Sequence, residues 1–389
     1  MIAVALALTL LTALVVTAVL IPPLIRLSVR EGWVAQPGPR HVHRAPTPTV
    51  GGLAIIAGFA VALLLSFALE RLDPALTRSP FEQLRLGLLL VGAALVAMIS
   101  LIDDLRDLPA LPRLGVQILA ALIAVGPYLW DHTLYADALG APTEASGIIL
   151  TAFNFPFLNQ IPLHQISPWL AIGATIFWVV GMQNMVNWAD GLDGLAAGVT
   201  LIAAVTLALH TMRLHPPQHT VAMLPLALAG ACAGFLIFNF HPARLFMGDV
   251  GAMTIGYILG LSAIIGGAKL ATALLVMGVP LIDMAWLILA RTIQGHSAAH
   301  AGRDHLHHRL LDLGFSQPQV VFCYYTLSAT FGAIALLDFF TPLMKLAALL
   351  LLGLLVIGIM FYTERGGWGA KPVGSRRARS RANDTNAKP

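Results

Sequence analysis

Charged residues are scarce in this chain: only 11% of its 389 residues are Asp, Glu, Lys or Arg, whereas 58% are hydrophobic. A soluble domain carries about 25% charged residues, so this composition excludes a soluble globular protein. The apolar residues also fall in long blocks that are separated by short polar loops. The sequence therefore indicates a polytopic membrane protein.

Cysteine is almost absent as well, since only Cys232 and Cys323 occur and both lie inside apolar blocks. This excludes a disulfide framework and a cysteine-based metal site. The first apolar block begins at Met1 without a basic segment before it, and no convincing small-residue cleavage site precedes Arg26. We therefore expect a retained first helix rather than a cleaved signal peptide.

A membrane-spanning helix needs about 20 mostly apolar residues, and its backbone groups must be paired within the segment. The blocks therefore predict an all-α polytopic fold with about eleven transmembrane helices. The expected spans are residues 3–26, 48–69, 84–102, 113–130, 166–187, 194–212, 219–239, 250–267, 269–290, 319–340 and 342–362. They form one domain, 1–363, and a basic tail, 364–389, follows with the composition of a disordered segment.

An odd number of spans places the two termini on opposite sides of the membrane. If the C-terminus is cytoplasmic, that side holds most of the 23 Lys and Arg residues. Cytoplasmic loops are enriched in Lys and Arg, so we expect the N-terminus outside and the C-terminus inside. The formal net charge of +4 follows from this distribution and needs no nucleic-acid partner.

The longest loop on the outer side covers residues 131–165. Its segment from Gly147 to Phe153 is strand-like, and a second extended piece surrounds Ile161. Two such pieces predict a short hairpin at the membrane surface.

The segment NMVNWADGLDGL, from Asn184 to Leu195, places two carboxylates and two amides between apolar blocks. If the helix continues, Asn187, Asp190 and Asp193 share one face, whereas Gly191 and Gly194 favour a broken helix or tight turn. Turns and helix caps also attract Asn and Asp. Polar groups at membrane depth are costly unless they line a cavity, so we favour a functional site.

Two further inside loops carry carboxylates. Asp103 and Asp104 are adjacent at the end of a block, and such a pair favours a divalent metal ion between them. The alternative is a solvated helix end that Arg106 and Arg113 neutralise. Asp249 lies between Gly248 and Gly251, where backbone N–H groups and a carboxylate could meet a metal-bound phosphate, or where Asp249 could cap the next helix.

The largest inside loop, 291–318, contains Arg303, His305, His307 and His308. Three histidines within four residues suggest zinc, but no cysteine accompanies them, so donors to phosphate or sugar hydroxyls fit better. Asp283 is a further acid in the preceding span, where a hydrogen bond to a neighbouring helix would explain it. The Pro- and Gly-rich loop that contains Thr49 is, taken alone, an ordinary loop and helix cap.

Taken together, five loops place carboxylates, Asn, His, Arg and an aromatic ring on one side of the membrane. This pattern predicts a cytoplasmic active-site cleft in an enzyme that joins an anionic substrate to a lipid-phase one, with Mg²⁺ between them. The competing hypothesis is a cation-coupled transporter. A transporter places such groups near the bilayer midplane and often shows internal repeats, which this sequence lacks.

The motifs PTPTVGGLAI, IDDLRDL, NMVNWADGLDGLAAG, FNFHPARLFMGDVGAM and RDHLHHRLLDLGF occur in this order. Over nearly the whole chain, the sequence resembles the polyprenyl-phosphate N-acetylhexosamine-1-phosphate transferases, the MraY/WecA/TagO group. The resemblance implies transfer of a sugar 1-phosphate from a UDP-sugar to undecaprenyl phosphate, with release of UMP. It also implies a bacterial inner-membrane location and a Mg²⁺ cofactor, with Mn²⁺ as an alternative. A homodimer is compatible with the resemblance.

The resemblance also implies roles for individual residues. Asp249 corresponds to the Mg²⁺-binding carboxylate, with Asp103 and Asp104 beside the metal and one of them a base. The residues expected to contact the nucleotide-sugar and its phosphates are Thr49, Asn187, Asp190, Asp193, Asn239, Phe246, Arg303, His305, His307 and His308, with the ring of Phe246 stacked on uracil.

Two positions depart from the family pattern. The loop after the Asp pair lacks its usual basic residue after Pro109, so Arg113 is expected to replace it, and Ala252 stands where the metal motif usually has Ser. The histidine loop resembles the WecA/TagO arm. This favours UDP-N-acetylglucosamine as the donor, with the muramyl-pentapeptide nucleotide as the alternative.

Overall fold

The computed structural model describes residues 1–36, 46–106, 108–136, 142–153, 161–215, 217–265, 270–293, 295 and 304–365. Each of the eleven expected spans corresponds to helix in it. The long helices are α1 (Ile2–Glu31), α2 (Gly52–Leu69), α3 (Pro80–Arg106), α4 (Ala110–Val125), α6 (Pro168–Ala189), α7 (Leu195–Met212), α8 (His219–Asn239), α9 (Gly248–Ile264), α11 (Gly278–Ile293), α13 (Gln317–Leu336) and α14 (Pro342–Arg365). The all-α polytopic fold is confirmed.

Among the described helices, nine are long and apolar enough to cross a membrane alone, or up to ten if a bent pair is one span. The bent pair is α10 (Leu270–Val276) with α11, at an angle of 82°. Pro280 lacks the N–H that would bond to the carbonyl of Val276, which explains a break here. Helix α9 has 17 residues, and it is buried among other helices from Val250 onward, so it need not match the lipid thickness.

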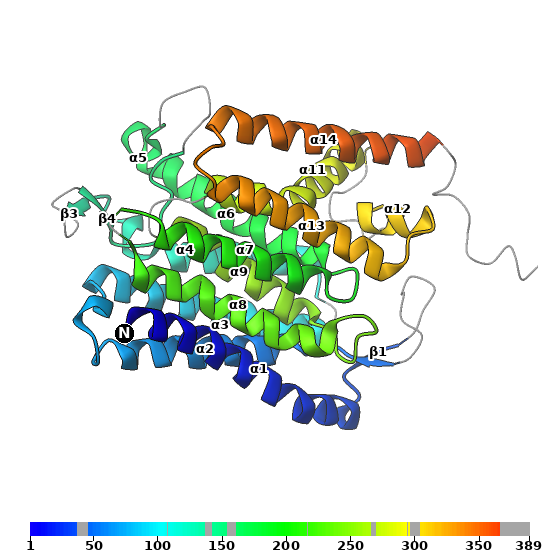
Figure 1. The fold of residues 1–389 in the computed structure, drawn as a ribbon, viewed down its shortest axis with the longest axis horizontal. Coiled ribbons are helices and arrows are strands. Elements are labelled where there is room, and N and C mark those ends of the chain that lie inside the picture. Colours follow the sequence, from blue (N-terminus) through cyan, green and yellow to red (C-terminus); the bar gives the residue numbers. More distant parts are fainter. Residues whose placement is uncertain are drawn as a thin grey trace, which may run out of the picture.

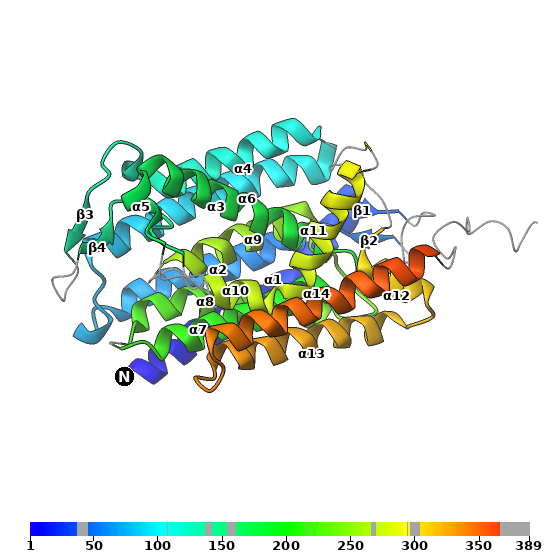
Figure 2. The same ribbon diagram turned by 90° about the horizontal axis from the view of Figure 1, so that it is seen from above.

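The helices run side by side, with α9 in the interior (Figure 1). Helix α9 packs against α3 and α6, and α1 packs against α2 and α8. Seen from above, α3 and α4 lie along one edge of the bundle and α13 and α14 along the opposite edge (Figure 2). The N-terminus of α1 lies at one end, and the C-terminal end of α14 lies at the other, as an odd number of spans requires.

The end where α14 finishes carries short elements. They are the two-stranded sheet of β1 (Val34–Ala35) and β2 (Thr47–Pro48), which pair antiparallel, and the short helix α12 (Leu306–Asp312). The predicted tail begins here: α14 includes its first two residues and ends at Arg365, and residues 366–389 lie outside the described part of the chain.

The opposite end carries the predicted outer loop. Here β3 (Leu134–Ala136) pairs antiparallel with β4 (Pro142–Ala145). The short helices η2 (Gly126–Leu129) and α5 (Leu163–Ile166) lie on either side of this hairpin in sequence, and η1 (Pro74–Leu76) connects α2 with α3. A hairpin exists, but the segment from Gly147 to Phe153 is not one of its strands. The N–H of Ile148 donates to the carbonyl of Ala124 (2.9 Å) and that of Leu150 to Oγ1 of Thr175 (2.9 Å). Helices therefore take up part of this backbone, and among the described residues the segment forms a single β-bridge, between Phe153 and Ile161.

Close contact between α2 and α9 depends on glycine. The N–H groups of Gly51 and Gly52 donate to the carbonyls of Phe246 and Met247, each at 2.9 Å. A Cβ at Gly52 would collide with the backbone of Gly251 in α9. Because neither Gly52 nor Gly251 has a side chain, the start of α2 can lie against the start of α9.

We expect Gly52→Ala to lower the thermal unfolding midpoint, because the added methyl group must push two buried backbones apart, at a cost of about 1–3 kcal/mol. The matched control is Gly87→Ala, since a Cβ at Gly87 meets nothing within 4 Å. Alanine is the better helix former, so the control should keep or raise the midpoint. Equal midpoints for the two variants would contradict this account of the contact.

Candidate active site

A pocket of about 560 Å³ opens at the end of the bundle that carries β1, β2 and α12. Five separate loops contribute to its lining. The predicted site residues that line it are Thr49, Asp103, Asp104, Arg113, Asn187, Asp190, Asp193, Asn239, Phe246, Asp249 and His308. The structure thus brings together groups that are up to 259 residues apart in the chain.

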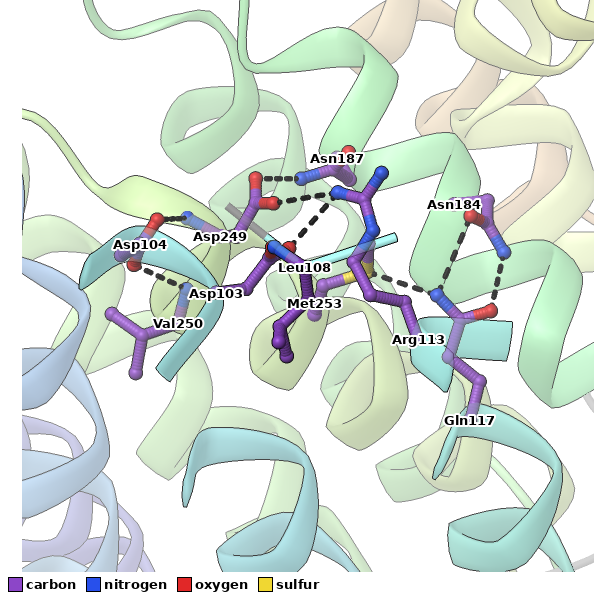
Figure 3. A network of polar contacts seen from close by, with 10 residues as sticks. All are labelled: Asp103, Asp104, Leu108, Arg113, Gln117, Asn184, Asn187, Asp249, Val250 and Met253. Carbon is purple, nitrogen blue, oxygen red and sulfur yellow. Dashed lines mark hydrogen bonds and ion pairs between the residues drawn. The ribbon is translucent and has the colours of Figure 1, made fainter. Parts of the chain in front are cut away.

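Asp104 caps helix α9 from the end of α3. Its Oδ1 accepts a hydrogen bond from the N–H of Asp249 (2.8 Å), and its Oδ2 accepts one from the N–H of Val250 (3.0 Å) (Figure 3). The first N–H groups of a helix have no partner within the helix and carry partial positive charge, so a carboxylate stabilises them. Asp104 therefore fills the capping role that the sequence suggested for Asp249, and it sets the position of Asp249.

Arg113 joins two carboxylates. Its Nη1 lies 2.9 Å from Oδ2 of Asp103 and 3.2 Å from Oδ2 of Asp249 (Figure 3). The other oxygen of Asp249 accepts a hydrogen bond from Nδ2 of Asn187 (2.7 Å), and Oδ1 of Asp103 accepts one from the N–H of Leu108 (2.6 Å). Arg113 thus neutralises Asp103, as the interpretation of a neutralised helix end expected. The same guanidinium also pairs with Asp249, the carboxylate that the family resemblance assigns to Mg²⁺.

Asp190 follows the last residue of α6, where the helix ends and a turn begins. Burial raises the pKa of Asp190 to about 7, and the negative charges of Asp249, Asp104 and Asp193 add to the shift. At neutral pH this carboxyl group is therefore divided between its protonated and ionised forms. A cation in the pocket would favour the ionised form of Asp190, because it would offset the repulsion between Asp190 and these three neighbouring acids.

Asp193 and Asn239 connect the loop after α6 with the loop before α9. Oδ2 of Asp193 lies 2.8 Å from Nδ1 of His241 and accepts a hydrogen bond from the N–H of Ala243 (3.1 Å). The Oδ1 of Asn239 accepts from the N–H of Gly194 (2.9 Å), and its Nδ2 donates to the carbonyl of Leu245 (2.9 Å). Gly194 has a φ of 81°, so the turn is a broken helix, one of the two geometries expected from the sequence. The amide of Asn239 is used to hold these loops together.

The three histidines differ in position. His308 lines the pocket, whereas the buried ring of His307 packs against Gly191 in the loop after α6, leaving no room for a Cβ there. Burial, followed by the charges of His308 and His305, lowers the pKa of His307 well below its usual value, so its ring is neutral at physiological pH. Arg303 lies outside the described residues.

His305 binds Asp283, an acid in α11 that the sequence had assigned to helix–helix bonding. Nδ1 of His305 lies 3.0 Å from Oδ2 of Asp283, and the N–H of Leu306 donates to Oδ1 (2.9 Å). Asp283 therefore anchors the start of α12, the helix that presents His308. Asp283, His305 and His307 also lie close enough to hold a metal ion, but the hydrogen bond between the first two already accounts for their proximity.

Asn184, one of the two amides of the NMVNWADGLDGL segment, pairs beside the pocket with Gln117, a residue to which no motif pointed. Nδ2 of Asn184 donates to Oε1 of Gln117 (2.8 Å), and Nε2 of Gln117 lies 3.3 Å from the sulfur of Met253 (Figure 3). Gln117 is one helical turn beyond Arg113, and Asn184 is nearly one turn before Asn187. The pair ties α4 to α6 directly behind the residues that contact Asp249. An amide inside an apolar block is the signal that could have revealed it.

The donor set of the pocket fits a hard divalent cation. Five carboxylates line one space, and Mg²⁺ prefers such oxygen ligands; they belong to Asp103, Asp104, Asp190, Asp193 and Asp249. Both oxygens of Asp104 already accept backbone hydrogen bonds, and those of Asp103 accept from Leu108 and Arg113. Asp193 also accepts a backbone hydrogen bond, from Ala243, whereas Asp249 accepts from the side chains of Asn187 and Arg113. Asp190 and Asp249 are therefore the two acids that a metal ion can reach without displacing a backbone N–H group.

Comparison with known proteins shows the family of this chain. The model of glycosyl transferase family 4 matches residues 86–267, which include most of the pocket residues. Decaprenyl-phosphate N-acetylglucosaminephosphotransferase of Mycobacterium tuberculosis (strain ATCC 25618 / H37Rv) is 36% identical over 387 residues, covering 91% of this chain and 87% of the relative. The probable undecaprenyl-phosphate N-acetylglucosaminyl 1-phosphate transferase of Bacillus subtilis (strain 168) is 30% identical, covering 86% of this chain and 84% of the relative.

A third relative has a different name. Phospho-N-acetylmuramoyl-pentapeptide-transferase of Desulforudis audaxviator (strain MP104C) is 31% identical over 334 residues, covering 84% of this chain and 94% of the relative. The bundle and its polar pocket define an integral membrane enzyme. The chain belongs to glycosyl transferase family 4, the family of polyprenyl-phosphate sugar-phosphate transferases that its motifs predicted.

Proposed function

We propose that this enzyme transfers N-acetylglucosamine 1-phosphate from UDP-N-acetylglucosamine to undecaprenyl phosphate, releasing UMP and initiating a cell-envelope glycan. The observation that carries the proposal is the group of five carboxylates, with Arg113, Asn187 and His308, in one pocket. Phosphoryl transfer is catalysed mainly by positioning and charge stabilisation, which this group of residues supplies. The names of the most similar relatives point to the same reaction.

In this proposal an oxygen of the lipid phosphate attacks the β-phosphorus of the nucleotide-sugar, and the bond from that phosphorus to the UMP oxygen breaks. Bound Mg²⁺, or Mn²⁺, would offset the charge of the reacting phosphates, with Asp249 and Asp190 holding it. The lipid phosphate is already an oxyanion, so no covalent enzyme intermediate is needed. Asp103, which pairs with Arg113, is the residue proposed to keep the attacking phosphate deprotonated.

Phe246 and Thr49 are proposed to hold the nucleotide. Both line the pocket, and the N–H of Phe246 donates to the carbonyl of Pro48 (2.7 Å), which keeps the two segments together. An aromatic ring at a pocket wall can stack on a base such as uracil. His308, presented by α12, is placed to donate to the diphosphate or the sugar.

A panel of UDP-sugars tests the donor. Purified full-length protein with undecaprenyl phosphate and Mg²⁺ should release UMP fastest from UDP-N-acetylglucosamine. UDP-N-acetylmuramyl-pentapeptide as the preferred donor would place the enzyme with the relative from Desulforudis audaxviator instead. Ion flux without UMP release from any donor would favour a transporter.

We expect the Mg²⁺ concentration that gives half-maximal rate to rise about tenfold as the pH falls from 8 to 6. The pKa of Asp190 is about 7, so this carboxyl group is mostly protonated at pH 6 and mostly ionised at pH 8. Protons therefore compete with the metal ion at the lower pH. Steady-state kinetics at a series of Mg²⁺ concentrations measures the effect. An equally steep dependence in Asp190→Asn would contradict the assignment to Asp190.

The orientation is part of the proposal. Because UDP-sugars are cytosolic, the pocket should face the cytoplasm, with the N-terminus outside. The excess of Lys and Arg in the loops at the pocket end supports this assignment. A thiol introduced at exposed Trp130, at the opposite end, should react with a membrane-impermeant reagent from outside the cell.

A further inference from the structure

A second pocket, of about 420 Å³, lies at the end of the bundle opposite the active site. Helices α7 and α13 end at it, and α14 begins there. Its charged and titratable lining residues are His210, Arg213, His215, Asp338 and Lys345. The proposed transfer reaction uses none of them.

The pocket carries an excess of positive charge. Arg213 and Lys345 are opposed by Asp338 alone, with Nη2 of Arg213 3.0 Å from Oδ2 of Asp338. The side chain of Asp338 is 94% exposed, so water weakens this ion pair. The ammonium group of Lys345 donates to the carbonyl of Ala335 (2.9 Å), which uses one of its three hydrogens. Both cations therefore keep donors for an anion.

Few basic residues lie at this end of the bundle. Two of them, Arg213 and Lys345, line the same pocket, which points to a binding site for an anion. The other described cations there have different partners or surroundings. Arg78 is buried against Glu70, and Arg85 donates to the carbonyl of Ala145 (3.1 Å). Arg213 and Lys345 come instead from separate helices, 132 positions apart in the chain, and line the same cavity.

Exposed apolar side chains flank the pocket. Between α13 and α14, Leu337 is 48% exposed and Phe339 is 78% exposed, and Leu343 and Met344 at the start of α14 are 52% and 40% exposed. Aromatic and apolar groups beside cations are typical of the boundary between lipid headgroups and acyl chains. These surroundings are those of a pocket that a lipid headgroup can enter.

We propose that this pocket binds the phosphate of an anionic phospholipid headgroup, with Arg213 and Lys345 as the two cationic contacts. The lipid's acyl chains then lie against the exposed apolar residues of the α13–α14 turn. An alternative role for both cations is to offset the negative C-terminal ends of α7 and α13. Removal of the cations distinguishes the two roles, because only the lipid site makes stability depend on added anionic lipid.

The test uses the full-length protein in a neutral detergent. The rise of the thermal unfolding midpoint is titrated with phosphatidylglycerol and with phosphatidylcholine. Wild-type protein should respond to phosphatidylglycerol at far lower concentrations than to phosphatidylcholine. In the double variant Arg213→Gln, Lys345→Gln the apparent dissociation constant for phosphatidylglycerol should rise about tenfold or more, since each cation near a membrane surface contributes about fivefold.

Three controls make the result specific. Arg71→Gln removes an exposed cation at the same end but outside the pocket, and it should respond like wild type. Asp338→Asn removes the opposing charge and should strengthen the response to phosphatidylglycerol. Transferase activity of the double variant shows that it is folded, because the pocket is remote from the active site. Equal titrations for wild type and the double variant would overturn the proposal, and stabilisation by inorganic phosphate alone would overturn its assignment to a lipid.

Discussion

Asp249→Asn should lower the rate of UMP release at least about 100-fold, which is the usual cost of removing one charged group that stabilises a transition state. The amide oxygen can still accept the hydrogen bond from Asn187, so the variant should fold. It loses the charge that pairs with Arg113 and that we assign to the metal ion. The measurement is the rate at saturating substrates over a range of Mg²⁺ concentrations.

The matched control for this variant is Asp338→Asn, the same chemical change at the opposite end of the bundle, which should keep the wild-type rate. The Mg²⁺ concentration that gives half-maximal rate should rise strongly in Asp249→Asn. If the variant kept a near-normal rate, the metal ion would have to be held elsewhere in the pocket.

Asp104→Asn should also reduce the rate about 100-fold, but for another reason. Both oxygens of Asp104 accept backbone N–H groups at the start of α9, and an amide there would oppose one N–H donor with another. A buried donor without an acceptor costs about 1–3 kcal/mol, and the first turn of α9 would shift together with Asp249. Excess Mg²⁺ should therefore not restore the rate, and the thermal unfolding midpoint should fall.

Asp104→Glu separates charge from geometry. It keeps the negative charge, but its longer side chain does not place both oxygens on two successive N–H groups. We expect it to be impaired as well. A fully active Asp104→Glu variant would mean that Asp104 contributes its charge rather than the capping geometry.

The sequence predicted the fold well because hydrocarbon imposes a simple rule: each long apolar block must be a helix. The predictions from the sequence are less accurate where a segment is surrounded by other helices rather than by lipid. Helix α9 is shorter than a full span because it is enclosed by protein, and the break before Pro280 divides a block that looked continuous. The strand-like segment after Gly147 pairs with helix groups that no local pattern reveals.

The residues of the site were also largely predictable, since polar groups at the ends of apolar blocks are costly without a purpose. The contacts that each of these residues makes were not predictable. Asp104 and Asn239 use their polar atoms to hold segments together, and Asp283 anchors the histidine helix. These contacts depend on partners that are distant in the chain, so only the three-dimensional structure reveals them.

The most direct test of the central claim is the fate of the two phosphorus atoms of the donor. UDP-N-acetylglucosamine labelled at its β-phosphorus is incubated with the full-length enzyme, undecaprenyl phosphate and Mg²⁺, and the label is traced after lipid extraction. Transfer of a sugar 1-phosphate predicts that the β-label moves into the lipid and that unlabelled UMP is released. A labelled UDP in the aqueous phase, or no label in the lipid, would contradict the account.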